Sequence, residues 1–366
     1  MRETLANREV FLGSSGVAHF LRNDLKNRKI RRLLVFTGQK SFTACGAESL
    51  ISEALNAVNW ERRSEFQSNP KMEELKNELA YATHFRPDGI LAIGGGSVLD
   101  MAKLVNFFLS VAIKPDAYLD GIREEERRAS LRPLIAIPTT SGTGSEATHF
   151  AVLYRAGKKY SVADPRLLPS TVVLNPTLTY TMNAYQTACT GLDALAQGIE
   201  SFWAVGATPE SRKYAEKAIR LALQYLEPCV NHPSPENRQG MLHASYWAGR
   251  AIDLSKTTLP HALSYGLTSQ HNYPHGHAVG IFLPAVFSWH LEKKVVPEKL
   301  IELLGKNDPV STLNSLLKQI GLDLKKPLGE LEIDRLSKRV NPERLNNNPV
   351  APNAHELKEI LKTALL

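Results

Sequence analysis

The chain has 366 residues, 43% of them hydrophobic and 22% charged, which is the composition of an ordinary globular protein. Because single cores stop growing at roughly 250–300 residues, this length predicts two domains. No run of about 18 uncharged apolar residues occurs, and the first residues lack the apolar segment of a signal peptide, so we expect a cytoplasmic protein with no membrane partner. The net charge of +7 comes from scattered basic residues, which predicts no nucleic-acid partner and is compatible with an anionic small substrate.

Strand and helix patterns alternate in the first half of the chain. RRLLVFTG (31–38) and RPLIAIPTTSG (132–142) are typical of buried strands, and GILAIGGGSVLDMAKLVNFFL (89–109) is typical of a strand, a glycine turn and a helix. This alternation predicts an α/β domain with a parallel sheet and helices on both faces. From about Asn183 onward, long amphipathic helical patterns replace the strands. We therefore expect an α/β dinucleotide-binding domain over residues 1–182 and an all-helical metal and substrate domain over 183–366.

Three cysteines, Cys45, Cys189 and Cys229, are scattered along the chain without CxxC spacing. This pattern suggests neither a disulfide framework nor a thiolate zinc site. We expect all three to be small buried side chains.

A glycine turn between a predicted strand and a predicted helix is typical of a phosphate site. Backbone N–H groups of Gly94, Gly95, Gly96 and Ser97 can meet a pyrophosphate there, because no Cβ is in the way. A second loop, PTTSGTGSE (138–146), offers further hydroxyl groups for a nucleotide. The candidates in it are Thr139, Thr140, Thr143 and Ser145. Together the loops favour a dinucleotide, although the pattern is not GxGxxG, and a tight strand-to-helix turn is the alternative.

The end of the early strand bears on the choice of cofactor. An acidic residue at this position would bind the ribose 2′-hydroxyl group and repel a 2′-phosphate. Gly38 stands there instead, followed by Gln39, Lys40 and Ser41. We expect NADP rather than NAD, with Gly38 leaving room and Lys40 near the phosphate; an ordinary polar turn is the alternative.

Acidic and imidazole side chains indicate a metal site in the second half. Asp193 and Gln197 are i and i+4 on a predicted helix, hence on one face. His261 lies near the start of another helical pattern, and His275 and His277 are expected in a loop before the next helix. A single histidine is more often structural than a ligand. An Asp with two His from separate elements nevertheless suits a catalytic divalent ion, because three protein ligands leave one position open.

The motifs GGGSVLDMAK, PTTSGTGSEAT, GLDALAQGIES and HALSY followed by PHGHAVG resemble those of the iron-containing alcohol dehydrogenases, which share the dehydroquinate synthase-like fold. The resemblance covers nearly the whole chain. It implies a dinucleotide-binding domain, a helical domain and a divalent metal, Fe or Zn, in the cleft between them. It also implies a small aldehyde or alcohol substrate, NADP or NAD as the cofactor, and a homodimer or larger homo-oligomer.

Matched to the family, Asp193, His261 and His275 fall on metal-ligand positions, whereas Gln197 stands where the family has a fourth ligand, a histidine. Gln197 is then a weak ligand, a partner of metal-bound water, or a sign of a lost metal. Tyr265 replaces a histidine that is discussed in the family as a proton relay. Candidates for that role here are Tyr265, His271 and His277.

The resemblance implies further contacts for the cofactor and substrate. Asp100 and Lys103 are expected to face the cofactor, and Lys159 its phosphate or ribose. The second-half motifs look like the branch containing phosphonoacetaldehyde reductases, for whose anionic substrate Lys256, His271 and His149 are candidates. The alternatives are a generic small-alcohol or polyol dehydrogenase, a dehydroquinate synthase-like lyase, and a non-catalytic binding protein with a lost metal site.

Overall fold

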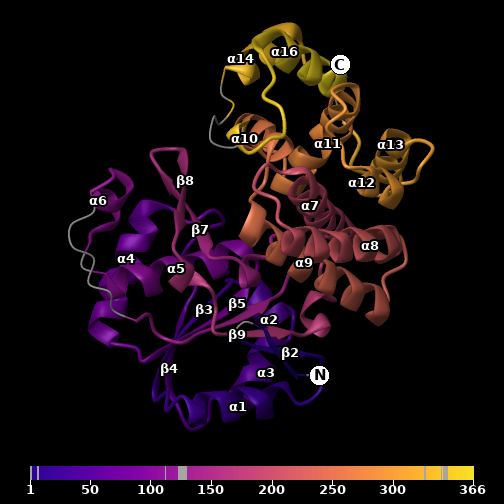
Figure 1. The fold of residues 1–366 in the computed structure, drawn as a ribbon. Coiled ribbons are helices and arrows are strands. Elements are labelled where there is room, and N and C mark those ends of the chain that lie inside the picture. The colour runs from indigo at the N-terminus through magenta and orange to yellow at the C-terminus, as the bar shows by residue number, and fades with distance from the viewer. Residues whose placement is uncertain are drawn as a thin grey trace. The chain divides into compact units, whose positions relative to one another are not determined.

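The computed structural model describes residues 2–5, 8–111, 113–122, 130–324, 327–338, 340 and 345–366. The chain forms two compact units, shown in Figure 1. The first comprises Met1–Thr140 with Ser145–Thr181, and the second comprises Ser141–Gly144 with Met182–Leu366. A short piece of the PTTSGTGSE loop thus belongs to the second unit.

A seven-stranded sheet in the order β1-β2-β9-β6-β5-β3-β4 runs through the first unit. Neighbouring strands are parallel except for β1 and β2, which are antiparallel. The predicted α/β unit with a parallel sheet is therefore confirmed. The strands are β1 (Arg2–Leu5), β2 (Arg8–Leu12), β3 (Arg32–Thr37), β4 (Asn59–Arg63), β5 (Gly89–Gly94), β6 (Leu134–Pro138) and β9 (Thr171–Leu174).

A separate antiparallel hairpin was not expected from the sequence. It consists of β7 (Phe150–Arg155) and β8 (Lys158–Ala163), joined at Ala156 and Gly157, which both have positive φ. Because β8 reads KKYSVA and is largely exposed, it lacks the apolar run by which the buried strands are identified.

Helices cover both faces of the sheet, which explains the continuous apolar runs of its central strands. On β3, Leu33 and Val35 join the core formed with α1 and α3, whereas Leu34 and Phe36 join the core formed with α4 and α5. The helices of this unit are α1 (Val17–Asn27), α2 (Ser41–Ala44), α3 (Ala47–Ala54), α4 (Met72–Phe85), α5 (Gly96–Ser110), α6 (Pro115–Leu119), and the short 3₁₀ turns Ser145–Ala147, Pro165–Leu167 and Pro176–Thr179.

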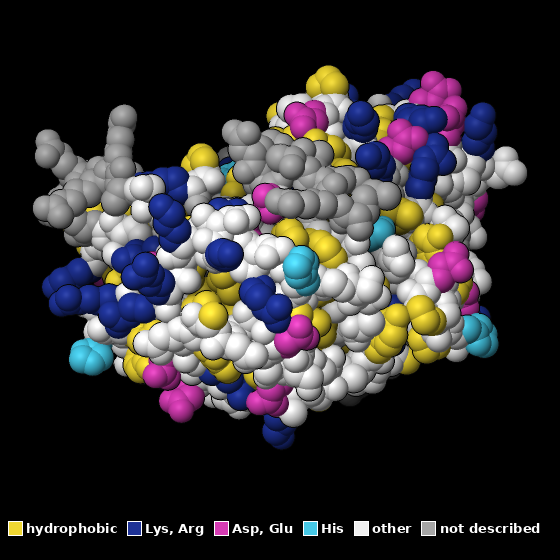
Figure 2. Space-filling model, turned by 90° about the horizontal axis from the view of Figure 1, so that it is seen from below, with side chains coloured by type: hydrophobic (Ala, Val, Ile, Leu, Met, Phe, Trp, Pro, Cys, Tyr) yellow, Lys and Arg dark blue, Asp and Glu magenta, His cyan; other side chains and the backbone are white. Residues whose placement is uncertain are grey.

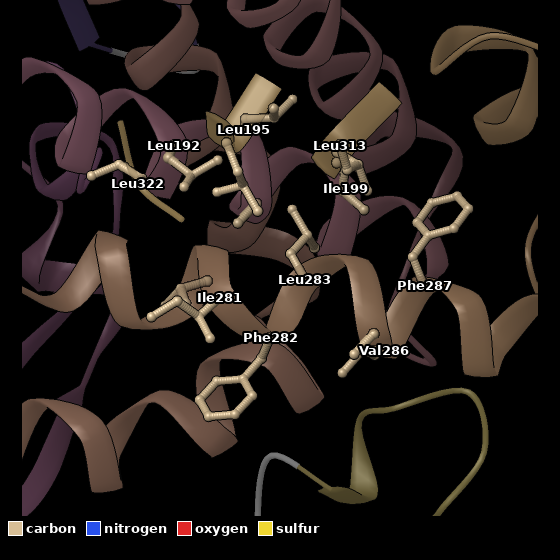
Figure 3. Close-up of a cluster of buried hydrophobic side chains, with 14 of the residues drawn as sticks. Leu192, Leu195, Ile199, Ile281, Phe282, Leu283, Val286, Phe287, Leu313 and Leu322 are labelled. Atoms are coloured by element: carbon tan, nitrogen blue, oxygen red, sulfur yellow. The ribbon is translucent and has the colours of Figure 1, made fainter. Parts of the chain in front are cut away.

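In its described residues the second unit is helical, which confirms the predicted all-α half. Its core is continuous from α7 to α16 and includes Leu195 and Ile199 of α7, which lie beside Leu283 of α11 (Figure 3). This packing fixes α7 and α11, two of the three helices that carry the candidate metal ligands. The helices are α7 (Ala184–Trp203), α8 (Pro209–Asn231), α9 (Pro235–Ser255), α10 (Leu259–Gln270), α11 (His275–Glu292), α12 (Glu298–Leu303), α13 (Pro309–Gln319), α14 (Glu330–Ser337) and α16 (Ala354–Leu365).

On the face shown in Figure 2, Lys and Arg side chains form separate groups with Asp and Glu between them. Within the part of the chain that the structure describes, no helix has the length and apolar character needed to cross a bilayer. All three cysteines are buried, as expected, and none of them forms a disulfide bond within the described residues.

Candidate metal centre and cofactor cradle

Helix α7 presents Asp193 and Gln197 on one face, one turn apart, and both are almost completely buried. The helix begins at a clear signal, since the Asn183 side chain accepts a hydrogen bond from the N–H group of Gln186. The start of α11 lies directly against this helix: a Cβ on Gly276 would come within 1.9 Å of the Cys189 carbonyl oxygen. The glycine of the PHGH motif therefore allows the backbone carrying His275 to approach α7.

The histidines come from the N-terminal ends of two further helices. His261 is the third residue of α10. His275 is the first residue of α11, and His277 lies in its first turn, so the loop expected for this pair is wrong. Pro and Gly in NYPHGH are typical of a loop, but here Pro274 only precedes the helix and Gly276 permits close packing.

The side chains of Asp193, His261 and His275 form a cluster within the second unit. One ligand atom of each lies within 4.8 Å of the others. Nε2 of His261 lies 3.2 Å from Oδ1 of Asp193, and that oxygen is buried with no hydrogen-bond partner. Two ligand atoms that each bind one ion at about 2 Å lie about as far apart as the 3.2 Å measured here between Nε2 and Oδ1. The cluster therefore fits a divalent metal.

Glu200, which the sequence reasoning missed, supports His261 from the other side. Its side chain is 0% exposed, and Oε1 lies 2.7 Å from Nδ1 of His261. With the Nδ1 proton donated to Glu200, the lone pair of Nε2 faces Asp193, as in carboxylate–histidine–metal arrangements. Glu200 is seven residues after Asp193, two turns along α7. This spacing, which places both carboxylates on the same side of the helix, is the only signal in the sequence that could have identified Glu200.

The two carboxylates dominate the electrostatics of the metal-free cluster. Burial lowers the pKa of His261, but the negative charges of Glu200 and Asp193 next to its two ring nitrogens outweigh this effect and raise the pKa to about 10. Burial would raise the pKa of Asp193, yet the close contact with His261 and the nearby imidazoles hold it below its usual value. The site thus favours positive charge, whether a proton or a metal supplies it.

Gln197 has an amide oxygen that is buried without a hydrogen-bond partner, while its Nε2 lies 3.5 Å from the Thr143 carbonyl oxygen. Such a buried acceptor is costly unless something occupies the site beside it. The arrangement suits both the ligand and the water-binding interpretation. The three other candidate ligands, Asp193, His261 and His275, are all present in the cluster.

The three proton-relay candidates occupy different environments. The ring of Tyr265 is stacked near that of His275, with centroids 6.5 Å apart. His277 is fully buried, and its Nδ1 lies 2.9 Å from the hydroxyl of Tyr185, a residue that sequence reasoning did not identify. Burial raises the pKa of Tyr185 to about 12. His271 is the partly exposed residue that ends α10.

The glycine turn has the predicted geometry in the first unit. Gly94 ends β5, and α5 begins at Gly96 with no side-chain cap on its first N–H groups. A Cβ on Gly94 would clash with Val98 at 2.5 Å, and one on Gly95 would lie 3.3 Å from the side chain of Thr140. The adjacent Thr139 donates its N–H to the carbonyl of Gly94. Uncapped N–H groups at the start of a helix fit a phosphate.

Ser97 and the acidic residue of α5 have partners within the protein. The Ser97 hydroxyl accepts the N–H of Asn69. Asp100 accepts hydrogen bonds from the Ser145 hydroxyl at 2.7 Å and the Val152 N–H at 3.0 Å. Burial raises the pKa of Asp100 against the opposing charge of Lys103. Asp100 and Ser145 therefore fasten the second loop to α5.

Lys103 was expected to face the cofactor, but its side chain is buried within the protein. Its side chain is 1% exposed, and Nζ donates to oxygens of Ser145, Thr148 and Phe150. Because an ammonium group has three protons, these acceptors fully occupy it. Lys159 on β8 is partly exposed, and its positive charge acts to lower the pKa of Asp100. Lys103 is thus a buried support of the loop.

The turn after β3 is held by a cation from the neighbouring strand. Arg62 donates from Nε to the Thr37 hydroxyl at 2.8 Å and from Nη2 to the carbonyls of Gly38 and Gln39. Lys40 beside them is exposed. Arg62, which sequence reasoning missed, adds a positive charge to this turn.

The three candidates for an anionic substrate do not share one unit. His149 belongs to the first unit, where its ring packs edge-on against Phe150. Lys256 and His271 lie in the second unit, at the ends of α9 and α10 respectively.

Two family models and several known proteins match this chain. Residues 7–176 match the family model for iron-containing alcohol dehydrogenase, and residues 187–365 match that for the C-terminal part of the Fe-containing alcohol dehydrogenase family. An alcohol dehydrogenase from Thermococcus barophilus is 30% identical over 359 residues, which cover 92% of this chain and 93% of that protein.

Two further relatives have names that specify a substrate. A phosphonoacetaldehyde reductase from Streptomyces viridochromogenes is 38% identical over 209 residues, covering 54% of this chain and 52% of that protein. The crystal structure of a sulfoacetaldehyde reductase from Bifidobacterium kashiwanohense in complex with NAD⁺ superposes with a TM-score of 0.89 at 27% identity, covering 100% of this chain and 99% of that one.

Proposed function

Because the chain belongs to the iron-containing alcohol dehydrogenase family, we propose that it uses NADPH to reduce a small aldehyde carrying an anionic group, with phosphonoacetaldehyde as the first candidate. The enzyme class expected from the sequence, a metal-containing NAD(P)-dependent alcohol dehydrogenase, is confirmed at the level of the family. So is the cofactor class, a nicotinamide dinucleotide with a divalent metal.

The observation that carries the proposal is the buried cluster of Asp193, His261 and His275. These side chains would hold Zn or Fe, with the unpartnered oxygen of Gln197 as a weak further ligand or an acceptor for bound water. When bound, the ion supplies a Lewis acid that polarises a carbonyl group. Glu200 keeps the imidazole of His261 oriented for this role.

The proton that completes aldehyde reduction must come from a group beside the substrate. Tyr265, near the ring of His275, is the candidate most closely tied to the cluster. His277 and Tyr185 form a hydrogen-bonded pair in the same unit, and His271 is the third candidate. The Tyr185 hydroxyl is protonated at neutral pH, since its pKa, which burial raises to about 12, lies far above 7.

The first unit would bind the dinucleotide and the second would bind metal and substrate. Gly94, Gly95, Gly96 and Ser97 would receive the pyrophosphate at the uncapped start of α5. The polar side chains of the first unit that are proposed to line the same ligand are Thr139, Thr140, Ser145, Asp100 and Lys159. The absence of a carboxylate at Gly38, together with the cations Lys40 and Arg62, supports NADP.

The experiment that tests the substrate compares phosphonoacetaldehyde with 3,3-dimethylbutanal, a neutral aldehyde of similar shape, while NADPH oxidation is followed. The proposal predicts a kcat/KM at least about tenfold higher for the phosphonate, because a charged group contributes on the order of 1–2 kcal/mol to binding. Equal values would favour the generic small-alcohol or polyol dehydrogenase. A lyase would consume no net cofactor with either compound. Light scattering would test the homodimer or larger assembly expected from the family.

A further inference from the structure

Lys256 has a backbone conformation that is normally reserved for glycine. It lies between α9 and α10, with φ 61° and ψ 176°. In this region the Cβ atom crowds the neighbouring peptide groups, so a residue with a side chain is strained there. A lysine in such a position is unexpected unless its side chain is needed.

Hydrogen bonds on both sides hold this conformation in place. The Asn347 amide donates to the carbonyl of Ser255 at 2.8 Å and to that of Thr257 at 3.0 Å. The N–H of Lys256 itself donates to the carbonyl of Ile252, and its carbonyl accepts the Ser255 hydroxyl. The backbone at Lys256 is therefore determined by its neighbours, which is how strain persists at functional sites.

The residues that follow Lys256 are hydrogen-bonded to the metal cluster. Two residues after Lys256, the N–H and hydroxyl of Thr258 donate to Glu200, the same carboxylate that contacts His261. A buried hydrogen-bond network thus connects the backbone beside Lys256 to a candidate metal ligand. Within this unit the side chain of Lys256 is exposed, whereas Ser255, Thr257 and Thr258 are buried.

We propose that Lys256 binds the anionic group of the aldehyde and so determines the preference for a charged substrate. This inference rests on the proposed function and adds the residue that recognises the charge. A lysine ammonium group is a compact positive charge that suits a phosphonate or sulfonate. The strained backbone directs this side chain from a fixed segment, which reduces the conformational freedom lost on binding.

The test replaces Lys256 with glycine, which accepts the observed φ and ψ without strain. Lys256→Gly is expected to lower kcat/KM for phosphonoacetaldehyde at least about tenfold, mainly through KM, and to lower that for 3,3-dimethylbutanal much less. It should also raise the thermal unfolding midpoint by about 1–3 °C because the strain is removed. Lys256→Arg should retain part of the preference.

Lys294→Gly is the matched control. Lys294 is also an exposed lysine with positive φ, 57°, in the same unit, but it follows α11. Its replacement also puts glycine at a position of positive φ and removes the same charge, so it should leave the ratio of the two kcat/KM values unchanged. If both variants lower the ratio equally, general electrostatic attraction explains the preference and the assignment of Lys256 is wrong.

Failure of the proposed function and failure of this inference give different results. The first would be visible in the wild-type protein as equal turnover of charged and neutral aldehydes. The second would be visible only in Lys256→Gly, as an unchanged preference. Calorimetry with the product 2-hydroxyethylphosphonate provides a readout without turnover: the variant should bind it at least about tenfold more weakly, and equal affinities would overturn the assignment.

Discussion

Nδ1 of His261 lies 2.7 Å from Oε1 of Glu200, while Nε2 of the same ring lies 3.2 Å from Oδ1 of Asp193. One imidazole thus lies between two buried carboxylates with different roles. Glu200 accepts the ring proton and is itself held by Thr258, whereas the Asp193 oxygen has no hydrogen-bond partner. In the proposed metal site, Nε2 of His261 and the Asp193 carboxylate would bind the ion, while Nδ1 bonds to Glu200.

Replacing Glu200 with glutamine should weaken metal binding. The amide lacks the negative charge and can donate to Nδ1, which favours the tautomer whose proton lies on Nε2. We expect metal affinity to fall about 10- to 100-fold, measured by competition with a chromophoric chelator. Thr258→Val is the control, because it removes a hydroxyl contact with Glu200 at 3.2 Å but keeps the His261 contact. A Glu200→Gln affinity as high as that of this control would contradict the role of Glu200.

Replacing Gln197 with histidine should increase metal affinity. The substitution places an imidazole one turn from Asp193 on the same face of α7, where the amide oxygen now has no partner. We expect an affinity for Fe(II) at least about tenfold higher, and a changed visible spectrum of the Co(II)-loaded protein because the ligand set differs. An identical spectrum and affinity would show that position 197 does not face the ion.

Gly38→Asp should move the cofactor preference toward NADH. A carboxylate at this turn would repel the 2′-phosphate and accept a bond from the ribose hydroxyl. Its Cβ would lie 2.2 Å from the present position of the exposed Ser41 hydroxyl, so the Gly38→Asp/Ser41→Ala pair removes that clash. Fluorescence titration should show the NADPH-to-NADH affinity ratio falling at least about tenfold, with Gly38→Ala as the neutral control. An unchanged NADPH-to-NADH affinity ratio would show that the 2′-phosphate does not bind at this turn.

Glu146→Gln should change how stability depends on pH. Burial raises the pKa of Glu146 from 4.5 to about 7, against the nearby charge of Lys103. The folded state therefore holds this proton more tightly than the unfolded state, so the stabilisation is complete below about pH 4.5 and is lost as pH rises through about 7. Between pH 5 and 8 the variant should gain on the order of 2–3 kcal/mol of unfolding free energy relative to wild type. If urea unfolding gave the same difference in unfolding free energy between variant and wild type at pH 5 and at pH 8, the result would contradict this role of Glu146.

Much of the fold and site could be predicted because its signals are local. The strand–glycine–helix unit at 89–109 and the i, i+4 pair Asp193 and Gln197 depend on residues close in sequence. The metal cluster could be predicted because the motifs of the family also include His261 and His275. The β7–β8 hairpin was missed because its strands are half exposed.

The supporting residues could not be predicted because they act across long sequence separations. Glu200 meets His261 from 61 residues away, and Arg62 reaches the Gly38 turn from 24 residues away. Lys103 carries a charge typical of the surface, yet it is buried because five oxygens of one loop surround it. The strain at Lys256 is a backbone property that residue type does not reveal.

The most direct test of the central claim, that Asp193, His261 and His275 hold a catalytic divalent ion, is metal analysis of wild type and His261→Ala purified without chelators, together with NADPH-dependent turnover. The account predicts about one equivalent of Zn or Fe and turnover in the wild type, and the loss of both in His261→Ala, with a folded variant by circular dichroism. Turnover by a metal-free wild-type protein, or undiminished metal and activity in the variant, would contradict it.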